Sequence, residues 1–70
     1  MKLQNIIMLL ADKEVVTLEH HWKHHIIVDR KTVAELRNLT MYDMDLKNWG
    51  VASMEVGDGY GDLVISIAPV

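Results

Sequence analysis

The chain of 70 residues contains no cysteine and no phenylalanine, and it has a single proline. The absence of cysteine excludes disulfides, thiolate zinc sites and thiol nucleophiles, and it fits a reducing compartment. The longest apolar run, residues 6–11, is too short to cross a bilayer, and no small-residue cleavage site follows it. We therefore expect a cytoplasmic protein whose aliphatic core uses methionine to fill gaps.

Neither sign of charge dominates the chain. The formal net charge is −3 with neutral histidines, and 50% of the residues are hydrophobic. This balance argues against disorder and against direct nucleic-acid binding, which needs a basic stripe. Because so short a domain buries only about 60% of its unfolded surface, good packing, a partner, a homodimer or a metal would have to support it.

Apolar residues at helical spacing predict two helices. The first set recurs at i, i+3, i+4 and i+7 and consists of Leu3, Ile6, Ile7 and Leu10. It predicts a helix over about residues 2–11. Thr32 and Glu35 have the spacing of a capping box, which predicts a second helix over about residues 33–39. Residues 40–50 fit either a further short helix or an irregular connection.

Four segments rich in β-branched residues predict strands. They span residues 15–21, 24–30, 51–56 and 63–68. A reversal centred on Trp22 turns the first two into a hairpin in which Leu18 faces Ile26. The same register places His20 opposite His24 at the end of the hairpin.

The order of these elements predicts one α+β domain over residues 1–70. The glycine-rich residues 57–61 join the last two strands as a second hairpin. Two hairpins and two helices, in the order α-β-β-α-β-β, most simply form a four-stranded antiparallel sheet with the helices on one face. The side chains expected to point inward from the second hairpin are Ala52, Met54, Val56, Leu63, Ile65 and Ile67.

All the histidines of the chain lie close together, as His20, His21, His24 and His25. Neutral imidazole is a ligand for zinc, nickel and copper, and paired strands hold opposite Cβ atoms about 5 Å apart. A zinc site takes three or four protein ligands, so carboxylates or a second chain would have to complete it. The simplest interpretation is a polar hairpin tip without metal. The alternatives are a bound metal, for which zinc is the expected cofactor, and a pH sensor.

Large aromatic side chains fall in predicted connections, as Trp22, Tyr42, Trp49 and Tyr60. Tryptophan and tyrosine dominate binding hot spots because they bury a large area and keep a polar handle. Acidic residues in the same connections are Asp43, Asp45, Asp58 and Asp62. Together they predict a protein-binding surface that meets a basic partner. The alternative is that the two tryptophans close the open ends of the core.

No catalytic motif is present in the chain. Asp43 and Asp45 begin like a calcium loop, but the glycine and the final glutamate of that motif are missing. Residues 57–61 lack the lysine and helix of a phosphate loop, and so short a chain leaves little room for a walled pocket. We therefore expect a protein that is not an enzyme, with a small metal-dependent hydrolase as the alternative.

Several stretches together resemble the small proteins of phages and mobile elements in Gram-positive bacteria. These are residues 9–12 leading into 15–18, then 32–36, then the closing hairpin 53–67. Some small, acidic, cysteine-poor phage proteins are anti-CRISPR inhibitors, and some of those hold zinc. The resemblance implies a non-enzymatic inhibitor in the host cytoplasm that occludes a nucleic-acid-binding nuclease. The alternatives are a zinc-stapled domain or dimer and a structural interaction protein.

Overall fold

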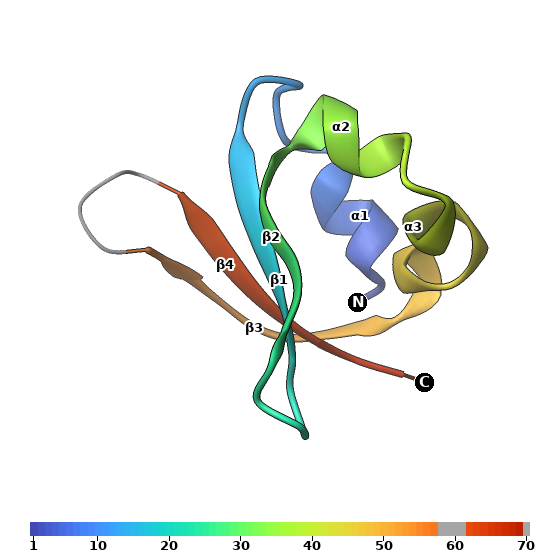
Figure 1. Ribbon diagram of the computed structural model, residues 1–70, viewed down its shortest axis with the longest axis vertical. Helices are drawn as coiled ribbons and strands as arrows, with labels where there is room; N and C mark the ends of the chain where they lie inside the picture. Colours follow the sequence, from blue (N-terminus) through green and yellow to red (C-terminus); the bar gives the residue numbers. More distant parts are fainter. Residues whose placement is uncertain (58–61, 70) are drawn as a thin grey trace.

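The sheet consists of two hairpins whose inner strands lie side by side (Figure 1). The computed structural model describes residues 1–57 and 62–69. The strands are β1 (Val15–His20), β2 (Ile26–Thr32), β3 (Gly50–Val56) and β4 (Leu63–Ala68), in the order β2-β1-β4-β3. Each hairpin is antiparallel, but β1 and β4 run parallel. The sheet is therefore mixed, and the prediction of a purely antiparallel sheet is wrong.

The parallel pair follows from the helical connection between β2 and β3. This connection contains α2 (Val33–Arg37), α3 (Thr40–Met44) and the 3-10 turn η1 (Leu46–Asn48). A tight hairpin would reverse the chain, whereas a crossover of a dozen or more residues returns it to the end of the sheet where the previous strand began. Figure 1 shows β3 starting near the end at which β2 starts. Strands β2 and β3 consequently run in one direction, and β1 and β4 in the other.

The N-terminal helix α1 (Leu3–Ile7) is shorter than the predicted span of residues 2–11. The chain before it is tied to the start of β3, because the Leu3 N–H donates to the Trp49 carbonyl at 2.8 Å. In addition, the Val51 N–H donates to the Met1 carbonyl at 2.8 Å. These bonds fix α1 across the sheet, where Leu3 and Ile7 are fully buried.

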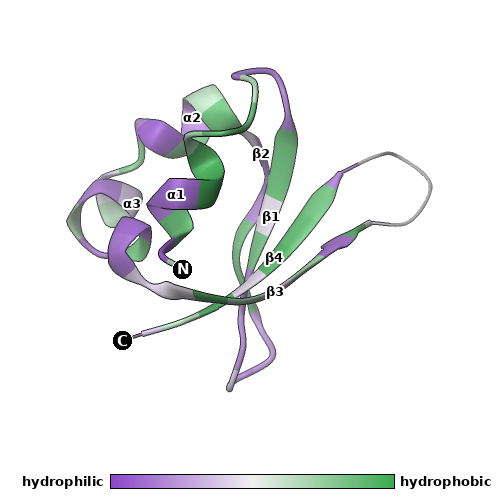
Figure 2. Cartoon of the chain, turned by 180° about the vertical axis from the view of Figure 1, so that it is seen from behind, coloured by the Kyte–Doolittle hydropathy of each residue, from purple (hydrophilic) through white to green (hydrophobic). Residues whose placement is uncertain are grey.

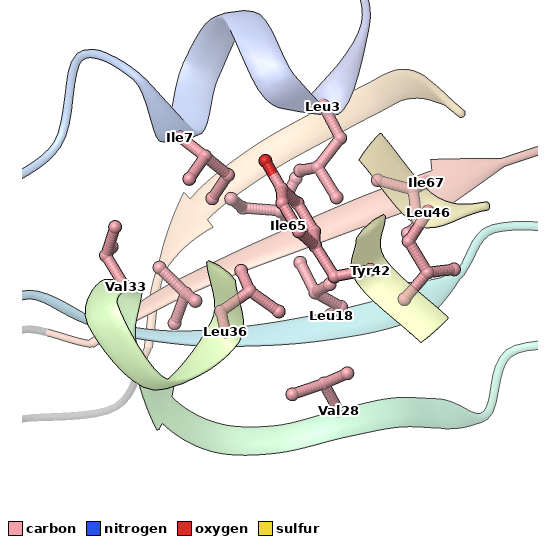
Figure 3. Close-up of a cluster of buried hydrophobic side chains, with 11 residues drawn as sticks. Leu3, Ile7, Leu18, Val28, Val33, Leu36, Tyr42, Leu46, Ile65 and Ile67 are labelled. Atoms are coloured by element: carbon pink, nitrogen blue, oxygen red, sulfur yellow. The ribbon is translucent and has the colours of Figure 1, made fainter. Parts of the chain in front are cut away.

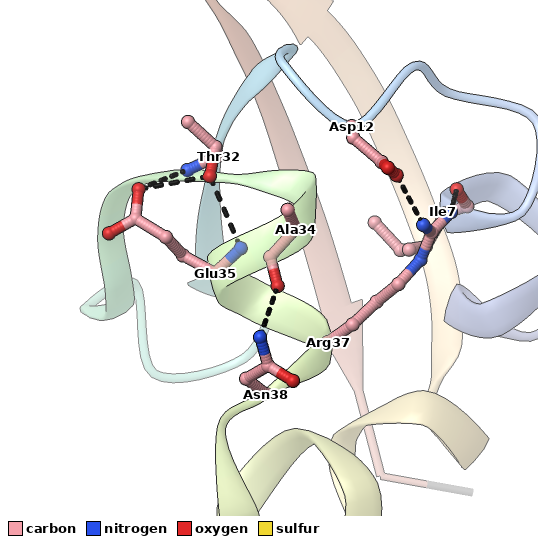
Figure 4. A network of polar contacts seen from close by, with 7 residues as sticks. All are labelled: Ile7, Asp12, Thr32, Ala34, Glu35, Arg37 and Asn38. Carbon is pink, nitrogen blue, oxygen red and sulfur yellow. Dashed lines mark hydrogen bonds and ion pairs between the residues drawn. The ribbon is translucent and has the colours of Figure 1, made fainter.

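The predicted capping box at the start of α2 is confirmed (Figure 4). The Glu35 N–H donates to Thr32 Oγ1 at 3.2 Å, and the Thr32 N–H donates to Glu35 Oε1 at 3.3 Å. The helix itself ends at Arg37, where one guanidinium nitrogen donates to Asp12 and another to the Ile7 carbonyl at the end of α1. A polar network thus joins the two helices above the core.

The core lies between the helices and the inner strands (Figure 3). Hydropathy follows this arrangement, with apolar stretches along β4, the first part of β1 and parts of the helices (Figure 2). Each fully buried aliphatic side chain contributes about 1.5–3 kcal/mol. The buried set is Leu3, Ile7, Val16, Leu18, Val28, Val33, Leu36, Tyr42, Leu46, Ile65 and Ile67.

The register of the first hairpin differs from the prediction. Leu18 lies opposite Val28, and Ile26 lies opposite Glu19. The reversal takes residues 21–24 rather than a turn centred on Trp22, because the His20 N–H donates to the His25 carbonyl at 2.8 Å. The longer loop and two shifts of register in β1 and β2 move Ile26 out of the core, where it is 52% exposed.

The second hairpin has the predicted strands, but its outer strand is not buried. Ile65 and Ile67 are fully buried, whereas Met54 and Val56 are 45% and 69% exposed. Strand β3 is an edge strand, and the helices lie over the other strands (Figure 1). The register also shifts at Ala52, which is exposed. The inward set predicted for β3 is therefore wrong.

Candidate functional site

The tip of the β1–β2 hairpin surrounds one buried histidine. His20 is 6% exposed. Its ring centroid lies 5.4 Å from that of His25 and 6.1 Å from that of Trp22. The ring of Trp49, just after η1, stands nearly perpendicular to the His20 ring at 82°, with the two centroids 5.5 Å apart. Four rings from two parts of the chain therefore meet at this end of the sheet.

Hydrogen bonding defines the protonation state of His20. The Lys23 N–H donates to His20 Nδ1 at 3.2 Å, so Nδ1 must carry a lone pair and the neutral ring must hold its proton on Nε2. Burial lowers the pKa of His20 from 6.5, and the neighbouring Lys23, His25 and His21 lower it further. The site is therefore built for a neutral imidazole.

The structure pairs His20 with His25, so the predicted pair of His20 and His24 is wrong. His24 adopts the left-handed conformation at φ 54°, and its side chain is exposed in the loop. His21 is also exposed, while its N–H donates to the Ile67 carbonyl at 2.8 Å. Within residues 1–57 and 62–69, no three His, Cys, Asp or Glu side chains are grouped to hold a metal ion.

An open hollow of about 470 Å³ lies beside the ring cluster. Its lining is mostly apolar and includes the rings of His20, His25 and Trp49. One cation and one anion stand at its edge, Lys23 from the hairpin and Asp45 from the end of α3. The remaining lining residues are Ile27, Met41, Leu46 and Pro69.

A second open hollow, of about 490 Å³, continues from the first along β2 and α3. The two hollows share Ile27 and Met41. The second one also carries one cation and one anion, Lys31 and Asp29. Its other lining residues are Val28, Leu39 and Thr40. We call the two together the β2–α3 groove.

The predicted binding aromatics have different environments. Trp22 is 65% exposed at the hairpin tip, and Trp49 is half-buried in the groove wall. Tyr42 is 7% exposed and packs in the core (Figure 3), so the expectation that it lies exposed in a connection is wrong. Burial also raises the pKa of Tyr42. Tyr60 lies outside the described residues.

The predicted acidic residues are not gathered in one patch by the structure. Asp45 lines the groove, and the exposed Asp43 pairs with Lys47 one turn further on at 3.1 Å. Asp62 pairs with Arg30 at 2.9 Å. Asp58 lies outside the described residues.

The site residues expected from the sequence do not include the apolar residues at the centre of the groove. Met41 and Ile27 line both hollows, and Leu39 lines the second. A signal was available for Met41, because it lies among the aromatic residues of an unassigned segment and methionine adapts to partner surfaces. Ile27 gave no such signal, since it lies within a regular apolar strand pattern.

Three comparisons with known proteins found no match for the chain. No protein-family model matches the chain, and neither a curated protein nor a solved structure matches it at a significant level. Among the described residues, no helix has the length and apolar character needed to span a membrane.

Proposed function

We propose that the chain is a non-enzymatic protein-binding module whose β2–α3 groove holds a short apolar segment of a partner protein. The observation that carries this proposal is the position of Met41. It lines both hollows and is 48% exposed in the free chain. An exposed apolar surface of this kind is typical of interaction sites, and methionine adapts to the shape of what it binds.

Charge at the groove supports an uncharged occupant. Each hollow is flanked by one cation and one anion, Lys23 with Asp45 and Lys31 with Asp29. A strongly charged segment would meet repulsion from one member of each pair. An apolar segment with polar groups at its ends satisfies both pairs.

The edge of β2 favours side-chain packing over the addition of a further strand. Its register against β1 shifts twice, and Arg30 adopts a left-handed conformation at φ 46°. Irregular, charged edges of this kind prevent strand pairing in natural sheets. The partner segment therefore gains its binding energy from the hollows beside β2.

Two methionines of α3 provide a matched test. Met41 lines both hollows, whereas Met44 lines neither and is 69% exposed. A displayed library of short random peptides is selected on the wild-type chain. Peptides with adjacent apolar residues should be enriched. Their affinity for Met41→Ser should be at least tenfold lower than for the wild type, a loss of about 1.4 kcal/mol. Their affinity for the control Met44→Ser should equal that for the wild type.

Two results would contradict this proposal. One is the enrichment of no peptide at all. The other is an equal loss of affinity for Met41→Ser and Met44→Ser. Both variants replace exposed side chains, so both should retain the wild-type melting temperature within the small change expected at the surface.

One concrete form of such a module is an inhibitor that occludes a host RNA-guided nuclease. The exposed carboxylate of Asp45, which lines the groove, supports it, because a carboxylate can meet a basic channel. Purified RNA-guided nucleases of Gram-positive bacteria are the probe. The wild-type chain should reduce DNA cleavage, and Met41→Ser should restore it; cleavage that the wild type leaves unchanged speaks against this form.

A further inference from the structure

Three different atoms of His20 hold the tip of the β1–β2 hairpin. Its N–H donates to the His25 carbonyl, and its own carbonyl accepts from the His24 N–H, both at 2.8 Å. Its Nδ1 accepts from the Lys23 N–H at 3.2 Å. The first two bonds are independent of pH, whereas the third exists only while the imidazole is neutral.

Protonation of His20 would replace this third bond with a clash of donors. Both nitrogens of an imidazolium carry hydrogens, so Nδ1–H would face the Lys23 N–H at a site that is 6% exposed. A donor that faces another donor, with no acceptor in reach, carries a free-energy cost. The tip can avoid that cost only by moving away from the ring.

The charges around His20 also favour the neutral ring. From the hairpin tip, Lys23, His21 and His25 face it, and each would repel an imidazolium. From the α3–η1 side, Asp45 lines the same hollow but is exposed to solvent. Trp49, whose ring contacts His20, and Ile67, which is paired with His20 on β4, carry no ionisable side chain.

We propose that His20 is a pH-sensitive latch: the neutral ring closes the hairpin tip against the groove, and protonation releases the tip. Lys23, His25 and Trp49 line the first hollow, so release changes the shape of that end of the groove. The movement of the tip stands on the contacts of His20 alone. Its effect on peptide binding rests on the proposed function.

The direction of the response follows from the pKa of His20. Burial, followed by the charges of Lys23, His25 and His21, lowers this pKa below its ordinary value of 6.5. The closed tip is therefore fully favoured above that value and is lost as pH falls through the lower pKa of the closed state. Between the pKa of His20 in the open tip and its lower pKa in the closed tip, the ratio of open to closed molecules should rise by up to about tenfold for each unit by which the pH falls.

NMR of the Lys23 amide and the Trp49 indole during a pH titration tests the latch, with a chelator present to keep metal ions out. In the wild type, both signals should move in one step below pH 6.5, and protection of the Lys23 amide should fall. His20→Asn offers an amide oxygen as acceptor and does not titrate, so it should show no step. His24→Asn, the matched control at an exposed position that tolerates asparagine, should keep the step.

A wild-type Lys23 amide that stays unchanged in acid would overturn the proposal, as would a step that survives in His20→Asn. Ring-nitrogen shifts of wild-type His20 keep the test decisive if that variant does not fold. They should report a proton on Nε2 at neutral pH, and a proton on Nδ1 would contradict the latch.

Peptide binding separates the latch from the proposed function. A peptide selected on the groove should bind the wild type more weakly as pH falls below 6.5. Because His20 itself lines the groove, the affinity for His20→Asn is compared only with itself, and it should not change across that pH range. A tip that titrates while no peptide binds would sink the proposed function and leave the latch standing. A peptide that binds independently of pH to both proteins would overturn the control of the groove by the tip, while the NMR titration alone decides whether the tip moves.

Discussion

His24 adopts a backbone conformation that favours glycine. Its φ of 54° is left-handed, a conformation that costs other residues about 1–2 kcal/mol and is least tolerated by β-branched side chains. We predict that His24→Val lowers the free energy of unfolding by about 1–2 kcal/mol relative to His24→Gly. Urea denaturation of the two variants measures the difference, and equal stabilities would mean that the loop does not require this conformation.

Single residues also mark where sequence reasoning reaches its limit. The burial of Leu3, Ile7 and Leu18 could be predicted, because their spacing places them on one face of a helix or strand. Tyr42 could not, because α3 is only five residues long. One turn of helix shows no periodicity, and the choice between core and surface then depends on tertiary contacts.

The capping box of α2 is the local element that the sequence specifies most directly. Thr32→Val removes the hydroxyl that accepts from the Glu35 N–H, and we predict a loss of about 1 kcal/mol in the free energy of unfolding. Thr32→Ser keeps the hydroxyl and should retain most of that stability. Thermal or urea denaturation of both variants measures the cost, and a Thr32→Val protein as stable as Thr32→Ser would contradict the role of the cap.

The cost of Thr32→Val should also depend on pH. The side-chain hydrogen bond from Thr32, together with that from its backbone, lowers the pKa of Glu35 from 4.5. A lowered pKa means that the stabilisation is present above 4.5 and is lost as pH falls through the pKa of the folded state. The difference between the wild type and Thr32→Val should therefore narrow in acid, while the part that comes from the Glu35 N–H bond to Thr32 Oγ1 remains.

The hairpins themselves were predictable, but the details of their turns were not. Strands β3 and β4 have nearly the predicted bounds, because a glycine-rich segment separates two β-branched runs. The turn of the first hairpin contains no glycine, so neither its length nor the left-handed His24 was indicated. An error of this kind shifts the register and changes which side chains meet, which is why His25 and not His24 lies beside His20.

The whole sheet depends on one property that no local pattern encodes. The inner strands of the two hairpins, β1 and β4, could have paired in a parallel or an antiparallel sense. The choice was made by residues 33–49, whose helices carry the chain back along the sheet. The groove arises from the same connection, since Met41 from α3 reaches Ile27 of β2 only through this path. The site was therefore no more predictable than the sheet order.

The parallel contact between β1 and β4 can be tested by a disulfide, because the chain has no cysteine of its own. Glu19 lies beside Ser66 in the parallel register, and both alternate with residues buried under the helices. Paired positions on adjacent strands have the Cα separation that a disulfide needs, about 4.4–6.8 Å. The double variant Glu19→Cys, Ser66→Cys should therefore oxidise within one chain and gain roughly 3–5 kcal/mol in the free energy of unfolding.

A control variant uses Val64, which lies two residues before Ser66 on β4 and on the same face of the sheet. Val64 is paired with Thr17 rather than with Glu19, so Glu19→Cys, Val64→Cys places the two sulfurs on a diagonal beyond comfortable reach. Mass spectrometry of the oxidised monomers should find the bridge in the first variant and free thiols in the second. If β1 and β4 were instead antiparallel, residues 66 and 19 would no longer be paired. The Glu19→Cys, Ser66→Cys variant would then remain reduced or form dimers, and this result would contradict the parallel pairing.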